Sequence, residues 1–263
     1  MKIIDCHCHV YPEKIVEKAV SGIGAFYDIP MVNDGRIQTL LEKGKENGID
    51  RHIIFSVATT PKQVPSINSF IAKTVSEYPD KFIGLGTLHP DSEDINADVE
   101  HIIELGLKGV KLHPDFQKFA LNDPKCDKMY HACRGRLPIL IHAGDKRYEY
   151  SNPDNIIPVL EKYPDLTVIA AHLGGYSVWE RVDKLNCYDN LFVDCSSSFA
   201  FMDKQTAVKL IRFFGAEKVL FATDFPMWDI KGELNYFNSL PLTQEERELI
   251  FYKNACKLFK IKL

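Results

Sequence analysis

The chain has 263 residues, of which 45% are hydrophobic and 26% are charged, and its formal net charge is −4. This size allows a large buried core, and barrel folds of this length often form a single domain. The negative charge and the lack of a basic run exclude a typical nucleic-acid-binding protein, because such proteins neutralise phosphates with clustered Lys and Arg.

The start of the chain and its cysteines indicate the compartment. Met1 and Lys2 lead directly into an apolar run, which leaves no room for a signal peptide, and no later run is long enough to cross a membrane. Seven cysteines at irregular spacing do not resemble a secreted disulfide framework. We therefore expect a cytoplasmic protein with no membrane or nucleic-acid partner.

Short apolar runs recur along the chain and predict buried strands. In chain order they cover residues 3–10, 52–57, 82–88, 109–112, 138–142, 167–172, 191–194 and 219–222. Most are continuous rather than alternating, as expected for parallel strands that are buried on both faces. Segments of helical length lie between them, at residues 37–47, 66–77, 95–105, 124–134, 155–162, 177–185 and 204–214.

This alternation predicts an α/β fold, a (β/α)8 TIM barrel in which residues 1–263 form one domain. An open doubly wound sheet is the main alternative. It would need a glycine-rich phosphate-binding turn after the first strand, where the sequence has Asp-Cys-His-Cys-His. The long connection at residues 11–36 would lie over the mouth of the barrel as a lid or substrate-binding loop.

The first predicted strand carries a dense polar motif. Because side chains alternate between the two faces of a strand, we expect Asp5, His7 and His9 on one face and Cys6 and Cys8 on the other. Two imidazoles on one face can share a cation, which then needs further ligands from elsewhere in the chain. The cysteines are interpreted as small buried apolar side chains.

Four more polar residues each end an apolar run: Lys111, His142, His172 and Asp224. In a barrel the carboxyl ends of the strands meet on one face, which is where the active sites of such barrels lie. A single histidine of this kind is more often a satisfied core residue than a ligand. The recurrence of metal-capable side chains at several strand ends favours a metal-dependent enzyme.

With these residues in place, the sequence resembles the amidohydrolase superfamily, in particular the amidohydrolase-related branch that includes aminocarboxymuconate-semialdehyde decarboxylase. The His-x-His pair of that family matches His7 and His9. Its histidines on strands five and six match His142 and His172, and its aspartate on strand eight matches Asp224.

The resemblance implies a metal-dependent hydrolase that cleaves a C–N or C–O bond of a small molecule through a metal-activated water. The expected metal ligands are His7, His9, His142 and Asp224. One Zn²⁺ is favoured, with other divalent ions as alternatives. Some family members bridge two metals with a carboxylated lysine on strand four, where this chain has Lys111, and a second ion would then bind Lys111 and His172.

Three residues are expected to act in catalysis. Asp224 would orient the water and shuttle its proton, and His172 would serve as a second acid or base. If its amine is not carboxylated, Lys111 would hold a substrate carboxylate. The alternatives without a role in catalysis are a solvent-exposed amine or an ion pair with Asp145 or Asp224. His113 and His89 also follow strand ends, but a turn before proline is sufficient to explain them.

Cationic and aromatic residues in the loops after the later strands suggest a small, partly apolar substrate that bears a carboxylate. They are Lys146, Arg147, Tyr148, Tyr176, Trp179, Phe199, Met227 and Trp228, together with the serines at 196–198. The closest alternative function is non-oxidative decarboxylation of an unsaturated or aromatic acid, which a single metal and a free His172 would favour. A catalytically silent barrel is disfavoured by the complete ligand set, and a homo-oligomer stays open.

Overall fold

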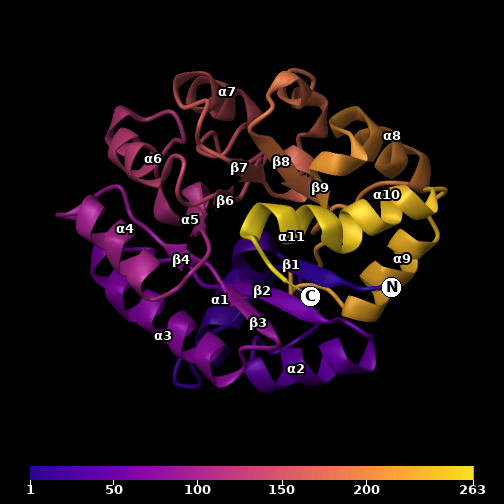
Figure 1. Cartoon of the computed structure of the whole chain (residues 1–263), viewed down its shortest axis with the longest axis horizontal. Helices are drawn as coiled ribbons and strands as arrows, with labels where there is room; N and C mark the ends of the chain where they lie inside the picture. Colours follow the sequence, from indigo (N-terminus) through magenta and orange to yellow (C-terminus); the bar gives the residue numbers. More distant parts are fainter. Residues whose placement is uncertain (263) are drawn as a thin grey trace.

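The computed structural model describes residues 1–262 and shows a ring of strands surrounded by helices (Figure 1). The strands are β1 (Ile4–His9), β2 (Arg51–Phe55), β3 (Phe82–Gly84), β4 (Gly86–Thr87), β5 (Val110–Leu112), β6 (Ile139–Ile141), β7 (Val168–Ala170), β8 (Leu191–Asp194) and β9 (Val219–Leu220). Every pair of adjacent strands in the two sheets is parallel.

Hydrogen bonds join the two sheets, β1-β2-β3 and β4 to β9, into one closed ring. β3 and β4 are halves of one strand interrupted at Leu85, whose N–H donates to the Ile54 carbonyl at 3.0 Å. On the other side the Cys6 N–H donates to the Phe221 carbonyl at 2.9 Å, and the His9 N–H donates to the Phe225 carbonyl at 2.7 Å. The described strands therefore occupy the eight positions of a (β/α)8 barrel, and the predicted fold class is confirmed.

Most helices cover the outside of the ring, whereas α11 crosses its centre (Figure 1) and α1 contributes to the pocket at its mouth. The helices are α1 (Val16–Tyr27), α2 (Ile37–Glu46), α3 (Val64–Glu77), α4 (Ile95–Glu104), α5 (Pro114–Gln117), α6 (Asp127–Cys133), α7 (Pro153–Lys162), α8 (Lys204–Phe214), α9 (Ile230–Asn238), α10 (Gln244–Glu248) and α11 (Asn254–Phe259). A π-helical turn, Leu249–Lys253, joins the last two. Over residues 1–262 no helix combines the length and the apolar content that a membrane crossing requires.

Two helix predictions differ from the structure. Residues 177–185 form only short 3-10 turns, Trp179–Arg181 and Leu185–Cys187, because Ser177 has a φ of 59°, which a continuing right-handed helix does not adopt. Conversely, the connection at residues 11–36 contains α1. This helix has no side-chain cap at its start and contains Gly22 and Gly24, so the usual sequence signals for a helix are weak there.

The apolar core has two layers. Ile4, Ile53 and Leu140 belong to a cluster inside the ring, whereas a larger cluster fills the space between strands and helices. α11 crosses the centre of the ring in Figure 1, and its Ala255 and Phe259 pack into the inner cluster beside Ile4, the first residue of β1. The amino ends of the strands are thus covered, and the carboxyl ends form the other mouth of the barrel.

Candidate active site

An irregularity in β1 decides which of its polar residues reach the barrel mouth. The register of β1 against β2 shifts between Asp5 and Cys8, which interrupts the simple alternation of faces. Cys6 therefore packs inside the ring, whereas Cys8 packs between strands and helices. The prediction that both cysteines share one face is wrong, because it assumed a regular strand.

Asp5 does not join the two histidines of the strand in the pocket. Its carboxylate accepts hydrogen bonds from the Thr223 N–H at 3.0 Å and the Thr223 hydroxyl at 2.6 Å. Asp5, Cys8 and His52 form a buried group, which we call the outer cluster, with ligand atoms within 4.8 Å of one another. His52 faces α2, since a Cβ on Gly44 would lie 2.2 Å from its Nε2.

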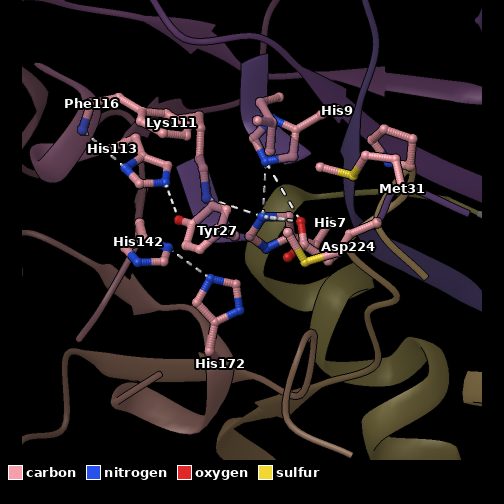
Figure 2. A pocket seen from close by; sticks show the side chains of 13 residues that line it. His7, His9, Tyr27, Met31, Lys111, His113, Phe116, His142, His172 and Asp224 are labelled. Carbon is pink, nitrogen blue, oxygen red and sulfur yellow. Dashed lines mark hydrogen bonds and ion pairs between the residues drawn. The ribbon is translucent and has the colours of Figure 1, made fainter. Parts of the chain in front are cut away.

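A pocket opens at the carboxyl ends of the strands, and most of the predicted site residues line it (Figure 2). Its walls are formed by His7, His9, Ile23, Tyr27, Met31, Lys111, His113, Phe116, His142, His172, Asp224, Pro226 and Met227. These residues come from β1, from α1 and the segment after it, and from the ends of β5, β6, β7 and β9. The pocket is therefore assembled from distant parts of the sequence, as expected for a barrel mouth.

His7, His9 and Asp224 lie together at one side of this pocket, and we call them the mouth cluster. Their ligand atoms all lie within 4.8 Å of one another. The Nε2 atoms of the two histidines are 3.3 Å apart, and Asp224 Oδ1 lies 3.4 Å from that of His7 and 3.6 Å from that of His9. Strand positions alone predicted this proximity, and the roles of these residues stay a prediction.

A carboxylate fixes the orientation of His7. His7 Nδ1 lies 2.8 Å from Asp194 Oδ2, and a carboxylate can only accept, so Nδ1 carries the proton and Nε2 keeps its lone pair toward the mouth cluster. The other Asp194 oxygen accepts from the backbone N–H groups of His172 and Ser196 at 3.1 and 3.0 Å. The sequence analysis missed Asp194, although it also ends an apolar run.

Burial sets the protonation of the mouth cluster. It lowers the pKa of His7 and His9 well below the ordinary value and raises the pKa of Asp224 to about 6. The imidazoles are therefore neutral, which is the form that binds metal ions. Neutral ring nitrogens converging with a carboxylate fit a divalent ion.

Lys111 is fully buried beside the mouth cluster. Its Nζ lies 3.1 Å from His7 Nε2 and 5.1 Å from the centre of the Phe55 ring. Burial lowers the pKa of its amine to about 8, against the opposing effect of Asp194 and Asp224. The alternative of a solvent-exposed lysine is thus excluded, and the pocket contains a cation at neutral pH.

His142 and His172 form a pair on the opposite wall. His142 Nδ1 lies 2.9 Å from His172 Nε2 (Figure 2). His172 Nδ1 lies 3.0 Å from the Ser196 carbonyl. Burial lowers the pKa of both rings, that of His172 to about 4. Of the four predicted ligands, three meet in the mouth cluster, and His142 lies in the same pocket with its Nδ1 directed to His172 instead.

The segment at residues 11–36 contributes directly to the pocket through α1. The Tyr27 hydroxyl lies 2.8 Å from His113 Nε2. Arg147, in the loop after β6, lies with its guanidinium carbon 4.7 Å from the ring centre of Phe26, donates to the Phe26 carbonyl, and pairs with Asp145 at 2.7 Å. The predicted lid thus covers the mouth, and an arginine from the barrel holds it.

Other residues proposed from the sequence have different positions. His113 lines the pocket, whereas His89 lies outside it beside Asp91. Of the loop residues, Met227 lines the pocket, and the indole N–H of Trp179 donates to the His172 carbonyl at 2.8 Å. Tyr27 was missed because no strand end precedes it.

Comparison with known proteins gives a family and similar folds. The sequence model of the family described as Amidohydrolase matches residues 4–261. The curated gamma-resorcylate decarboxylase of Polaromonas sp. is 23% identical in an alignment 253 positions long, and the match covers 74% of this chain and 75% of that protein.

Two solved structures resemble the barrel over nearly its whole length. An uncharacterised TIM-barrel protein from Bordetella bronchiseptica has a TM-score of 0.82 and 21% identity, covering 99% of both chains. A dihydroxybenzoic acid decarboxylase from Polaromonas sp., with bound manganese and the inhibitor 2-nitroresorcinol, has a TM-score of 0.72 and 19% identity, covering 98% of this chain and 97% of that one.

These similarities correct the expected chemistry. The expectation of a hydrolase is wrong, because the curated proteins that match this chain are gamma-resorcylate decarboxylases, and the alternative of decarboxylation agrees with them. One of these similar structures contains a bound divalent ion, which is manganese. The comparison therefore gives no support to the choice of zinc.

Proposed function

This chain belongs to the amidohydrolase family, and from that premise we propose that it is a metal-dependent decarboxylase of a small aromatic carboxylic acid. The reaction is non-oxidative. The bond between the ring carbon and the carboxylate breaks, carbon dioxide leaves, and a proton takes its place on the ring carbon. The similarity to the gamma-resorcylate decarboxylases supports this reaction class.

One observation carries the proposal for this chain: the buried cation Lys111 lies beside the mouth cluster, in a pocket lined by aromatic and imidazole side chains. His113 stacks on Phe116 with ring centres 3.8 Å apart, and Tyr27 lies across from them. An ammonium group attracts a carboxylate, and flat side chains favour a planar ring. A neutral amide or lactone would not need a buried cation in its site.

We assign the metal to His7, His9, His142 and Asp224, with one manganese or zinc ion as the expected content. Neutral imidazoles and a carboxylate are suitable donors for either ion. When bound, the ion supplies positive charge that holds the substrate oxygens and draws electron density from them. A second ion at Lys111 and His172 is not favoured, because the Lys111 amine lies 3.1 Å from His7 Nε2, on the side of the ring that faces the mouth cluster.

The remaining chemistry belongs to side chains of the chain itself. Asp224, the carboxyl of the mouth cluster, is the group we assign to deliver a proton to the ring carbon, which keeps the electron pair of the broken bond. His172 stands outside the mouth cluster and is free to act as a second acid or base. Lys111 orients the carboxylate that leaves.

A substrate panel tests this function. Purified protein loaded with Mn²⁺ would be supplied with hydroxylated benzoates, including 2,6-dihydroxybenzoate, and in parallel with small amides and lactones. We expect release of carbon dioxide and the corresponding phenol. Asp224→Asn should lower turnover by about two to four decades, the usual effect of losing a general acid, whereas His89→Gln outside the pocket should not. Hydrolysis of an amide or lactone without carbon dioxide release would overturn the proposal.

A further inference from the structure

Two buried polar atoms beside the pocket are left without hydrogen-bond partners. Within residues 1–262, His142 Nε2 and Asp115 Oδ1 are both buried and unpaired. They belong to side chains that face each other, because Asp115 Oδ2 lies 3.6 Å from His142 Nε2. Buried polar atoms without a hydrogen-bond partner are uncommon, so two of them on neighbouring side chains require an explanation.

The carboxylate of Asp115 is held in a fixed position. Asp115 lies in α5, directly after β5, and is only 3% exposed. The Ser151 hydroxyl donates to its Oδ2 at 2.6 Å, and the Ser151 carbonyl in turn accepts from the Gly144 N–H at 2.7 Å. Ser151 and Gly144 belong to the loop that follows β6 and His142. The same loop therefore positions both the Asp115 carboxylate and the His142 imidazole.

His142 has two partners but only one proton. His172 Nδ1 donates to the Ser196 carbonyl, so its Nε2 is an acceptor for a proton on His142 Nδ1. Asp115 would accept a proton on His142 Nε2 if the two side chains closed from 3.6 Å to hydrogen-bond distance. A neutral imidazole satisfies only one of these acceptors, which explains why His142 Nε2 is unpaired while Nδ1 is engaged with His172.

We propose that Asp115 is a positioning residue that selects the metal-binding tautomer of His142. Its carboxylate accepts the proton of Nε2 and thereby leaves the lone pair of Nδ1 for an ion. This inference rests on the proposed function, because it gives His142 the role of a ligand. Asp194 acts on His7 in the same way, at 2.8 Å, on the other side of the pocket.

The binding of Mn²⁺ tests this role without any substrate. The affinity of the purified protein would be measured by calorimetry for wild type, Asp115→Ala, Asp115→Asn and Ser151→Ala. Asp115→Ala should weaken binding by roughly 10-fold to 100-fold, the usual effect of losing a hydrogen-bond partner of a ligand. Asp115→Asn keeps an acceptor oxygen and should retain most of the affinity. Ser151→Ala loosens the carboxylate but keeps it beside His142, so it should weaken binding less than Asp115→Ala does.

A spectroscopic readout separates tautomer selection from a general loss of structure. In the Zn²⁺-loaded protein, the ¹⁵N signals of His142 should show a proton on Nε2 in the wild type, and this signal should be lost or broadened in Asp115→Ala. Equal Mn²⁺ affinity in wild type and Asp115→Ala, or equal losses in Asp115→Ala and Ser151→Ala, would overturn the inference alone. A wild-type protein that binds no Mn²⁺ would overturn the proposed function as well.

Discussion

Strand β1 supplies two clusters of metal-capable side chains, one on each side of the barrel wall. The mouth cluster and the outer cluster both bring three ligand atoms within 4.8 Å of one another, and both are buried. The mouth cluster lines a pocket, whereas the outer cluster is covered by α2, whose Gly44 lies against the ring of His52. The two clusters thus have similar residue types and similar spacing between their ligand atoms. They differ in that only the mouth cluster lines the pocket.

The outer cluster is also occupied by its own contacts. Asp5 accepts two hydrogen bonds from Thr223, and Cys8 Sγ lies 3.6 Å from His52 Nδ1. Burial, together with the nearby Asp5, raises the pKa of the Cys8 thiol well above its usual value. A protonated thiol is a poor ligand, so we expect the outer cluster to stabilise the wall and the mouth cluster to bind the ion.

The largest expected effect is that of removing both imidazoles of the mouth cluster. His7→Ala combined with His9→Ala should abolish Mn²⁺ or Zn²⁺ binding and decarboxylation, because a single carboxylate and His142 cannot hold the ion tightly. Elemental analysis of the purified double variant measures this directly. Wild-type metal content in that variant would show that the ion binds elsewhere, with the outer cluster as the first place to look.

The corresponding change in the outer cluster should affect stability alone. His52→Ala removes a ring packed against α2 and takes away the contact of Cys8 Sγ with His52 Nδ1, so we expect unfolding to become easier by about 1–3 kcal/mol. Metal content per folded chain should equal that of the wild type. Denaturant unfolding and elemental analysis on the same sample give both values, and a loss of metal at unchanged stability would reverse the assignment of the two clusters.

The rim of the pocket should show an intermediate effect. Arg147→Ala removes the guanidinium that lies over Phe26 and donates to its carbonyl, and a contact of this kind contributes about 1–2 kcal/mol. We expect KM to rise about tenfold with a smaller change in kcat, because the lid would close less readily over the substrate. Arg181→Ala, which removes an exposed pair with Asp154, is the matched control, and identical kinetics in both variants would exclude a role for Arg147 in closure.

A buried carboxyl on α9 should have the smallest effect on the site itself, and its effect on stability depends on pH. Burial, with the nearby Asp224, Asp5 and Asp229, raises the pKa of Glu233 to about 8. The folded state therefore binds a proton that the unfolded state releases, so this contribution to stability is complete at acidic pH and is lost as the pH rises through 8. The slope is about 1.4 kcal/mol per pH unit for one proton. Glu233→Gln should remove this decline in urea unfolding between pH 6 and 9, and an unchanged slope would exclude Glu233 as its source.

Much of the site follows from the sequence because the strands are continuous apolar runs with a polar residue at their ends. That rule located Lys111, His142, His172 and Asp224, and it could have located Asp194 as well. The barrel then brings these ends together, whatever their separation in the chain.

The rest depended on irregular local structure and on long-range contacts. Because of the register shift in β1, the side chains of Cys6 and Cys8 lie on different faces of the strand. The alternation of residues in the sequence does not predict such a bulge. Tyr27 reaches the pocket only because α1 folds back over the mouth, and Asp115 becomes relevant only through the ring of His142. The proposed reaction class, in turn, rests on similarity to decarboxylases, since hydrolysis and decarboxylation use the same strand-end residues.

Solvent deuterium incorporation tests the central claim, carbon–carbon cleavage with delivery of a proton at the mouth cluster, most directly. The Mn²⁺-loaded protein would be incubated in D₂O with 2,6-dihydroxybenzoate or with another acid of the panel that it turns over. We predict one molecule of carbon dioxide per phenol formed, and a single deuterium on the carbon that carried the carboxylate. No carbon dioxide and no deuterated phenol from any acid of the panel, together with hydrolysis of a panel amide or lactone, would contradict decarboxylation and restore hydrolysis.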